Sequence, residues 1–262
     1  MGCNLTESEV ALLMRWANAA AFLITIIVNT LANTSMLNGK NSGEISDLYP
    51  TLVTPAGYVF AIWGLIYILL LVYVVFQAFP SQKQKAFQKE VGVLFVLSCV
   101  FNVVWLFLWQ YGYITLSVLP MFALLATLIT TYLRLNIGKS NASLKEKLSV
   151  HLPFSVYLGW ITVASIADVA AALVSMNWDG FGLSSVTWAI LVIAVALIIT
   201  LLVIFTRRDI AYSLVLVWAL VGIAVKQSAN QSIVTTAEIS AIVILIALVL
   251  SILISGLRRQ KP

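Results

Sequence analysis

The run PAGYVFAIWGLIYILLLVYVVFQ, residues 55–77, decides the fold class of this chain. It carries no charged residue, and it is longer than the roughly 20 residues that a helix needs to cross about 30 Å of hydrocarbon. A backbone in lipid must satisfy its own hydrogen bonds, which favours a helix for so long a run. The dyad alternation that is typical of membrane β-barrels is absent. The run therefore predicts a membrane-spanning helix.

The composition extends this prediction to the whole chain. Of the 262 residues, 61% are hydrophobic and 10% are charged, whereas a soluble domain carries roughly 25% charged residues. Such a chain has too few polar groups to cover a surface in water, so we predict an integral membrane protein in contact with the lipid bilayer. The net charge of +5 does not indicate a nucleic-acid partner, because the basic residues cluster in particular loops.

Eight apolar runs predict an all-α fold with about eight transmembrane helices. Only TRRD, at residues 206–209, separates the sixth run from the seventh. We predict a tight helical hairpin there, because two arginines would be costly inside hydrocarbon. The eight runs cover residues 10–31, 55–77, 91–110, 114–135, 152–174, 186–205, 210–225 and 233–257.

The basic residues predict the topology. With eight spans, thirteen of the fifteen lysines and arginines fall on the face that carries both termini, and only Lys40 and Lys226 fall on the other. Positive residues concentrate in cytoplasmic loops, so we predict that both termini are cytoplasmic. The N-terminal MGCNLT also fits a myristoylation pattern at Gly2 with a palmitoylation candidate at Cys3, although we favour a chance match.

Three of the predicted helices carry a narrow stripe of aromatic and polar residues on one face. Polar groups are expensive against lipid, so we expect these stripes to face the protein interior or a cavity. For any single stripe, packing of aromatic rings between helices is the alternative. The stripes consist of Phe60, Trp63 and Tyr67, of Asn102, Trp105 and Trp109, and of Trp160, Ala164 and Asp168.

Asp168 is the most informative single residue, because a carboxylate inside a membrane must be paired, hydrogen-bonded or protonated. It is either a ligand-contacting or proton-carrying group or the acceptor of a hydrogen bond from another helix. Trp178 and Trp188 lie near predicted span ends, and we assign them to the aromatic belt of the membrane interface. The sequence shows no catalytic triad, Walker loop, dinucleotide fingerprint or metal-ligand cluster.

Three segments together resemble the tryptophan-rich sensory protein / translocator protein (TspO/MBR) family. TPAGYVFAIWGLIY (54–67) resembles the signature of that family's second helix, and FNVVW (101–105) resembles that of its third. PFSVYLGWITVASIAD (153–168) resembles its fifth helix, with Asp168 where the family carries asparagine. The three matches follow the family's order and cover the first five spans. Spans six to eight have no counterpart in the family's five-helix core, so the chain resembles a longer member of the family.

The resemblance implies a five-helix core over residues 1–178, with a lid loop at about 32–54, and a three-helix extension over 179–262. It implies a pocket among the first five helices for porphyrins, sterols and related flat molecules. We predict no metal and no resident cofactor, with a porphyrin or haem entering only as ligand. Leu48 and Tyr49 are expected to fold inward from the loop. The predicted ligand-binding residues are Tyr58, Phe60, Trp63, Tyr67, Asn102, Trp105, Trp109, Trp160 and Asp168.

Three functions fit these residues. The first is a non-enzymatic membrane protein that binds and senses or transports a lipophilic, tetrapyrrole-like or sterol-like ligand. The second is a proton-coupled secondary transporter that uses Asp168, and the third is a membrane enzyme that acts on a porphyrin-like substrate. A second copy of the same chain, forming a homodimer, is left open as a further partner.

Overall fold

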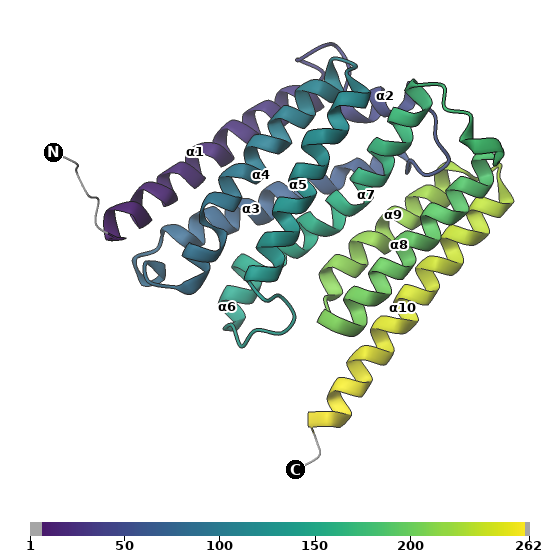
Figure 1. Cartoon of the computed structure of the whole chain (residues 1–262). Coiled ribbons are helices and arrows are strands. Elements are labelled where there is room, and N and C mark those ends of the chain that lie inside the picture. The colour runs from purple at the N-terminus through teal and green to yellow at the C-terminus, as the bar shows by residue number, and fades with distance from the viewer. Residues whose placement is uncertain (1–6, 260–262) are drawn as a thin grey trace. The chain divides into compact units, whose positions relative to one another are not determined.

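The computed structural model describes residues 7–259, and it describes side chains from residue 9 to residue 254. Within these residues the chain forms helices joined by loops and turns, with no β-strand (Figure 1). The predicted all-α fold class is confirmed. The motif at Gly2 and Cys3 lies outside the described residues.

Eight long helices correspond to the eight predicted runs. Among the described residues, seven helices are long and apolar enough to cross a membrane. The second of the seven reaches 22 residues because it includes the turn Gly57–Ala61 before α3. The remaining helix, α9, is also apolar but has 17 residues, at the lower limit of roughly 17–25 for a spanning helix. The eight are α1 (Glu7–Asn33), α3 (Ile62–Ala78), α4 (Ala86–Gln110), α5 (Ile114–Arg134), α7 (Leu152–Ser175), α8 (Ser185–Arg207), α9 (Ile210–Lys226) and α10 (Gln231–Arg259).

The second span begins differently from the prediction. Residues Gly57–Ala61 form a 3-10 turn, and the α-helical part starts only at Ile62. A 3-10 turn advances about three residues per turn instead of 3.6. Phe60 therefore lies in the 3-10 turn, whereas Trp63 and Tyr67 lie on the α-helix that follows it.

The chain divides into two compact units, and the first comprises the described residues up to Ser42 together with Trp63–Phe154. In this unit α4 packs against both α1 and α5. The buried faces of α1 and α4 repeat at alternating spacings of four and three residues, the pattern of left-handed helix pairs. This repeat comprises Asn18, Phe22, Thr25, Asn29 and Ala32 in α1, and Val91, Phe95, Ser98, Asn102, Trp105 and Trp109 in α4. Further buried residues of α4 are Phe87, Gly92, Cys99, Leu106 and Gln110.

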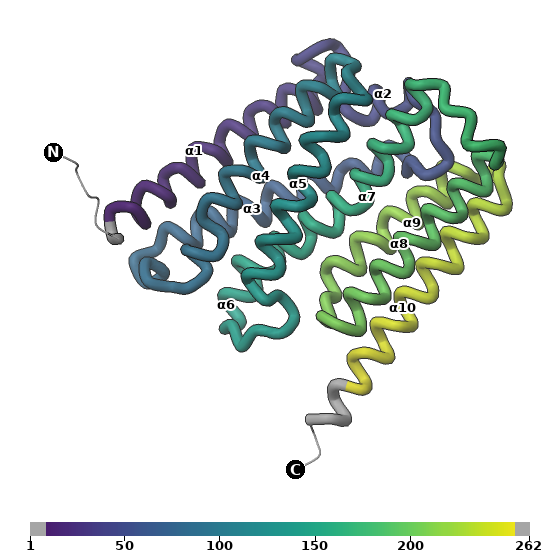
Figure 2. Tube along the Cα trace, viewed as in Figure 1, coloured from purple at the N-terminus to yellow at the C-terminus, as the bar shows by residue number. Residues whose placement is uncertain are grey.

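The second unit comprises Gly43–Ile62 and the described residues from Ser155 onward. In this unit α10 packs along both α8 and α9, and the three helices lie side by side in Figure 2. These units are defined by which residues contact one another. Their boundaries differ from the predicted boundary between domains at residue 178, which stays a prediction.

The hairpin between α8 and α9 is as tight as the TRRD sequence predicts. Arg208 ends α8 in the left-handed conformation, with φ of 56°. Asp209 then begins α9, because its Oδ1 accepts a hydrogen bond from Tyr212 N at 3.1 Å. Its Oδ2 accepts a second one from Ser155 Oγ at 2.6 Å. The buried Asp209 therefore both caps α9 and connects it to α7.

The first loop contains a short helix, α2 (Ser42–Asp47). Its Ile45 is buried, whereas Leu48 is 57% exposed. The expectation that Leu48 folds inward is wrong. Ile45 on the short helix is the buried apolar residue instead.

Candidate functional site

One face of α9 holds the segment that follows the first loop. Trp218 Nε1 donates a hydrogen bond to Val59 O at 3.2 Å, and Ala56 N donates one to Gly222 O at 3.1 Å. A Cβ atom on Gly222 would lie 2.2 Å from Val59 Cγ2, so the close approach requires glycine. Trp218 and Gly222 lie four residues apart, which places both on one face of the helix.

Two further contacts continue along the end of α9. Lys226 Nζ pairs with Asp47 Oδ1 at 2.6 Å, and Gln227 Nε2 donates to Thr51 O at 3.1 Å. The side chains of the ion pair are 29% and 62% exposed, and exposed pairs contribute little stability. The main-chain contacts and the glycine packing therefore determine where the segment lies.

This fixed segment forms one wall of a cavity of about 640 Å³ in the second unit. The other walls are one face of α7 over residues 166–174, the turn after α7, and the beginning of α8. Pockets of roughly 300–1,000 Å³ with mostly apolar walls hold drug-sized ligands. Within the described lining the polar side chains are those of Thr51, Asp179 and Ser185, together with the indole N–H groups of two tryptophans. The cavity has the size and the chemistry of a site for a lipophilic small molecule.

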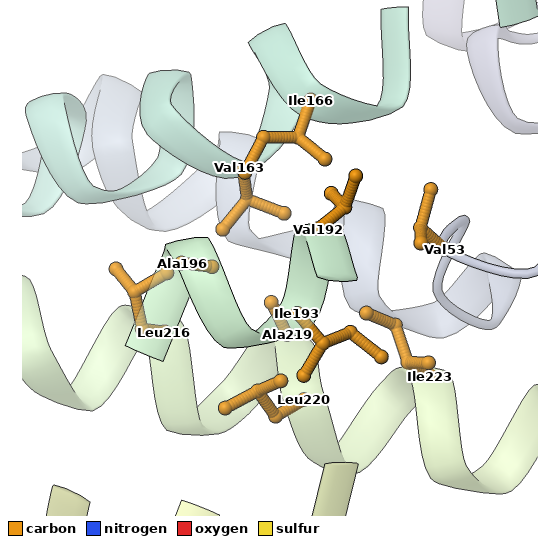
Figure 3. A pocket seen from close by; sticks show the side chains of 10 residues that line it. All are labelled: Val53, Val163, Ile166, Val192, Ile193, Ala196, Leu216, Ala219, Leu220 and Ile223. Atoms are coloured by element: carbon orange, nitrogen blue, oxygen red, sulfur yellow. The ribbon is translucent and has the colours of Figure 1, made fainter. Parts of the chain in front are cut away.

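The inner end of the cavity adjoins a small apolar crevice of about 30 Å³ (Figure 3). Cavity and crevice share Val53, Ile166 and Val192. Figure 3 shows side chains from α7, α8 and α9 converging there, and all ten side chains that line the crevice are apolar. A ligand group that reaches this end meets only hydrocarbon.

The rim of the cavity is aromatic. The rings of Trp178 and Trp188 lie 5.1 Å apart between centroids, and Phe181 stands edge-on to Trp178 at 5.3 Å. Trp188 Nε1 donates to Gly180 O at 2.8 Å, and Asp179 Oδ1 accepts from Phe181 N at 3.0 Å. These two hydrogen bonds hold residues 178–181 in a fixed turn.

The sequence interpretation missed this rim, because it assigned Trp178 and Trp188 to the interface belt. Both residues line the cavity. The available signal was the stretch WDGFG at residues 178–182, in which a tryptophan and an acidic residue precede two glycines. Gly180 and Gly182 adopt φ of 72° and 78°, a conformation that glycine reaches without strain.

Four of the predicted site residues form a continuous aromatic stack in the first unit. Trp63 stacks on Tyr67 at 5.6 Å and on Trp105 at 6.0 Å, and Trp105 stacks on Trp109 at 5.9 Å. The three tryptophans are at most 5% exposed. The rings of two separate predicted stripes, one on α3 and one on α4, therefore do lie together.

Polar contacts anchor the helix that carries two of these rings. Asn102 is fully buried, and its Oδ1 accepts a hydrogen bond from Asn29 Nδ2 at 2.8 Å. Trp109 Nε1 donates to Ser42 O at 3.2 Å, which ties the beginning of α2 to the end of α4.

The other predicted residues belong to the second unit and do not gather at one point. Phe60 stands edge-on to Trp160 at 5.8 Å, and Tyr58 stands edge-on to Trp218 at 5.4 Å. Asp168 is buried. At about 100° per residue it falls on the face of α7 away from residues 166, 169, 170, 173 and 174, which line the cavity. None of the nine predicted site residues is among the described residues that line this cavity.

Fold and composition together define an all-α, multi-pass integral membrane protein. The family model described as TSPO-like protein matches residues 15–250. The chain therefore belongs to the TSPO-like family, which confirms the resemblance drawn from the three segments. The matched region includes the three helices that follow residue 178. No curated protein and no solved structure matches the chain significantly.

Proposed function

We propose that this TspO-type membrane protein binds a lipophilic small molecule in the cavity between α7 and α8, for sensing or transport. The single observation that carries the proposal is a cavity of about 640 Å³ with mainly apolar walls. Transfer of apolar groups into such a space is favourable by about 0.8 kcal/mol per CH₂ group. The aromatic rim adds surfaces on which a flat ring can stack.

The family resemblance selects the first ligands to test, which are a sterol and a porphyrin or haem. In this proposal they are bound cargo or signal, and the protein is not an enzyme. The aromatic stack of Trp63, Trp105 and Trp109 in the first unit is the second proposed location for the same ligands. A homodimer and turnover of a porphyrin-like substrate stay predictions.

The test is a binding titration with two matched variants, each of which replaces an alanine with phenylalanine. The protein is placed in nanodiscs of zwitterionic lipid, and tryptophan fluorescence is followed during addition of a fluorescent sterol or protoporphyrin IX. Ala170→Phe puts a ring into the cavity, since Ala170 lines it. Ala20→Phe makes the same change on an exposed position of α1. Overpacking costs about 1–3 kcal/mol, so we expect Ala170→Phe to weaken binding by roughly five- to 150-fold and Ala20→Phe to leave it unchanged.

The opposite result locates the ligand elsewhere. If Trp63→Phe or Trp105→Phe weakens binding while Ala170→Phe has no effect, the cavity is not the site and the aromatic stack of the first unit is. If every one of these substitutions leaves the quenching unchanged, the quenching reports partition of the ligand into lipid.

Proton-coupled transport is the second candidate function, and the observation that favours it is the burial of Asp168, which is 2% exposed within a membrane-spanning helix. Buried intramembrane carboxylates are costly and often carry protons or ions. The measurement is uptake of a candidate substrate, under a proton gradient, into vesicles that contain the protein. Uptake is compared between wild type and Asp168→Asn. Uptake that persists unchanged in this variant would exclude the role.

A further inference from the structure

We propose that the cavity between α7 and α8 selects an amphiphile with a cationic head, that is, a hydrophobic amine. Its apolar tail extends into the crevice and its ammonium group lies at the rim beside Asp179. This inference rests on the proposed function of the same cavity, and it names the chemical class of the ligand.

The two ends of the cavity differ in chemistry. At the inner end, the crevice is lined by apolar side chains, including those of Val163, Ile193 and Leu220. At the rim, the described lining includes Asp179, Ser185 and two tryptophans. A molecule with one apolar and one polar end therefore has a single favourable orientation, with the polar end at the rim.

The rim carries one sign of charge. Among the described residues that line the cavity, Asp179 is the one charged residue, and none is basic. One of its oxygens accepts the hydrogen bond from Phe181 N. An ionised carboxylate offers about four lone-pair sites in total, so Asp179 retains acceptor capacity toward a ligand. An ammonium group is attracted there, whereas an anionic group in the same position is repelled.

The aromatic residues act in the same direction. Trp178 precedes Asp179 in the chain, and its ring lies 5.3 Å from that of Phe181 and 5.1 Å from that of Trp188 between centroids. The faces of indole rings attract cations by about 0.5–1 kcal/mol at exposed sites. Carboxylate and indole rings together are the chemistry that recognises an ammonium group.

The test uses three probes that share one brominated dodecyl tail and differ in the head, which is trimethylammonium, hydroxyl or carboxylate. Bromine quenches tryptophan fluorescence, and the part of the quenching that Ala170→Phe removes reports occupation of the cavity. The decisive variant is Asp179→Asn. Asparagine keeps the side-chain acceptor that caps the turn, removes the charge, and leaves partition of the probes into lipid unchanged. Asp179→Ser is a second neutral capping variant.

We expect Asp179→Asn and Asp179→Ser to weaken binding of the trimethylammonium probe by up to about five-fold, the usual scale for an exposed pair of opposite charges. Binding of the hydroxyl probe should stay the same, and binding of the carboxylate probe should strengthen. The trimethylammonium probe could instead bind wild type and both variants with equal affinity while the cavity still binds the hydroxyl probe. That result overturns this inference and leaves the proposed function standing. Absence of any quenching that is sensitive to Ala170→Phe overturns the proposed function as well.

Discussion

Gly222 is the residue on which the position of the cavity wall depends most closely. Its missing side chain allows Pro55 and Val59 to pack against α9, with only 2.2 Å between the site of a Cβ atom and Val59 Cγ2. A side chain there forces the two segments apart. The wall formed by residues 50–53 would move with them, because the same segment continues into it.

We predict that Gly222→Ala lowers the free energy of unfolding by about 1–3 kcal/mol, the usual cost of overpacking. The measurement is thermal unfolding of the purified protein in detergent. Gly64→Ala in α3 is the control, because a Cβ atom there meets nothing within 4 Å. Alanine in a helix is favoured over glycine by roughly 0.5–1 kcal/mol, so the control should be unchanged or slightly more stable. Equal effects of the two substitutions would contradict the close packing.

At the scale of elements, the cap of α9 joins two helices. Asp209 is buried, and one carboxylate both caps α9 and accepts the hydroxyl of Ser155. The cap of α8 differs, because Ser184 is exposed and its Oγ accepts a hydrogen bond from Thr187 N of the same helix. Both helices start with a capping residue, but only the start of α9 also holds α7.

We predict that Asp209→Ala costs more stability than Ser184→Ala. Loss of a cap costs about 0.5–2 kcal/mol in either case, and Asp209→Ala in addition leaves the buried hydroxyl of Ser155 without its acceptor, at about 1–3 kcal/mol. The measurement is again thermal unfolding, with the double variant Ser155→Ala, Asp209→Ala completing the comparison. If the double variant is no more stable than Asp209→Ala, the connection between α7 and α9 has no energetic weight.

Helix positions were predictable from the sequence because apolar length alone determines them. Polar residues end each run, and the lower limit of roughly 17 residues for crossing hydrocarbon leaves little freedom in where a helix begins. The exception was the start of the second span. There Ala56 N donates a hydrogen bond to Gly222 O of α9, and a 3-10 turn follows in place of α-helix. A local sequence pattern cannot predict a contact with a residue so distant in sequence.

The cavity was not predictable for a related reason. The stacking of Trp63 on Trp105 follows from stripes that a single helix displays. The cavity instead arises where three separate segments fail to fill the space between them. Trp178 and Trp188 looked like residues of an interface belt because periodicity describes a helix face and says nothing of the turn between two helices.

At the scale of the whole molecule, the distribution of charge predicts that both termini are cytoplasmic. This orientation places Lys40 outside and Lys83 inside. We predict that a membrane-impermeant maleimide labels Lys40→Cys in intact cells and labels Lys83→Cys only after the membrane is opened. Cys3→Ser removes one native thiol, and the other, Cys99, is buried. The reverse labelling pattern would invert the topology.

The central claim is that a ligand occupies the cavity between α7 and α8, and photo-crosslinking tests it most directly. A dodecylamine probe that carries a diazirine in its tail is bound in nanodiscs, irradiated, and located by mass spectrometry of the peptides. The account predicts labelling within residues 163–174 and 185–196, which line the cavity and its crevice. It predicts that an excess of unmodified amine removes this labelling. Labels concentrated at residues 60–67 and 102–109, or spread evenly over the lipid-facing helices, would contradict it.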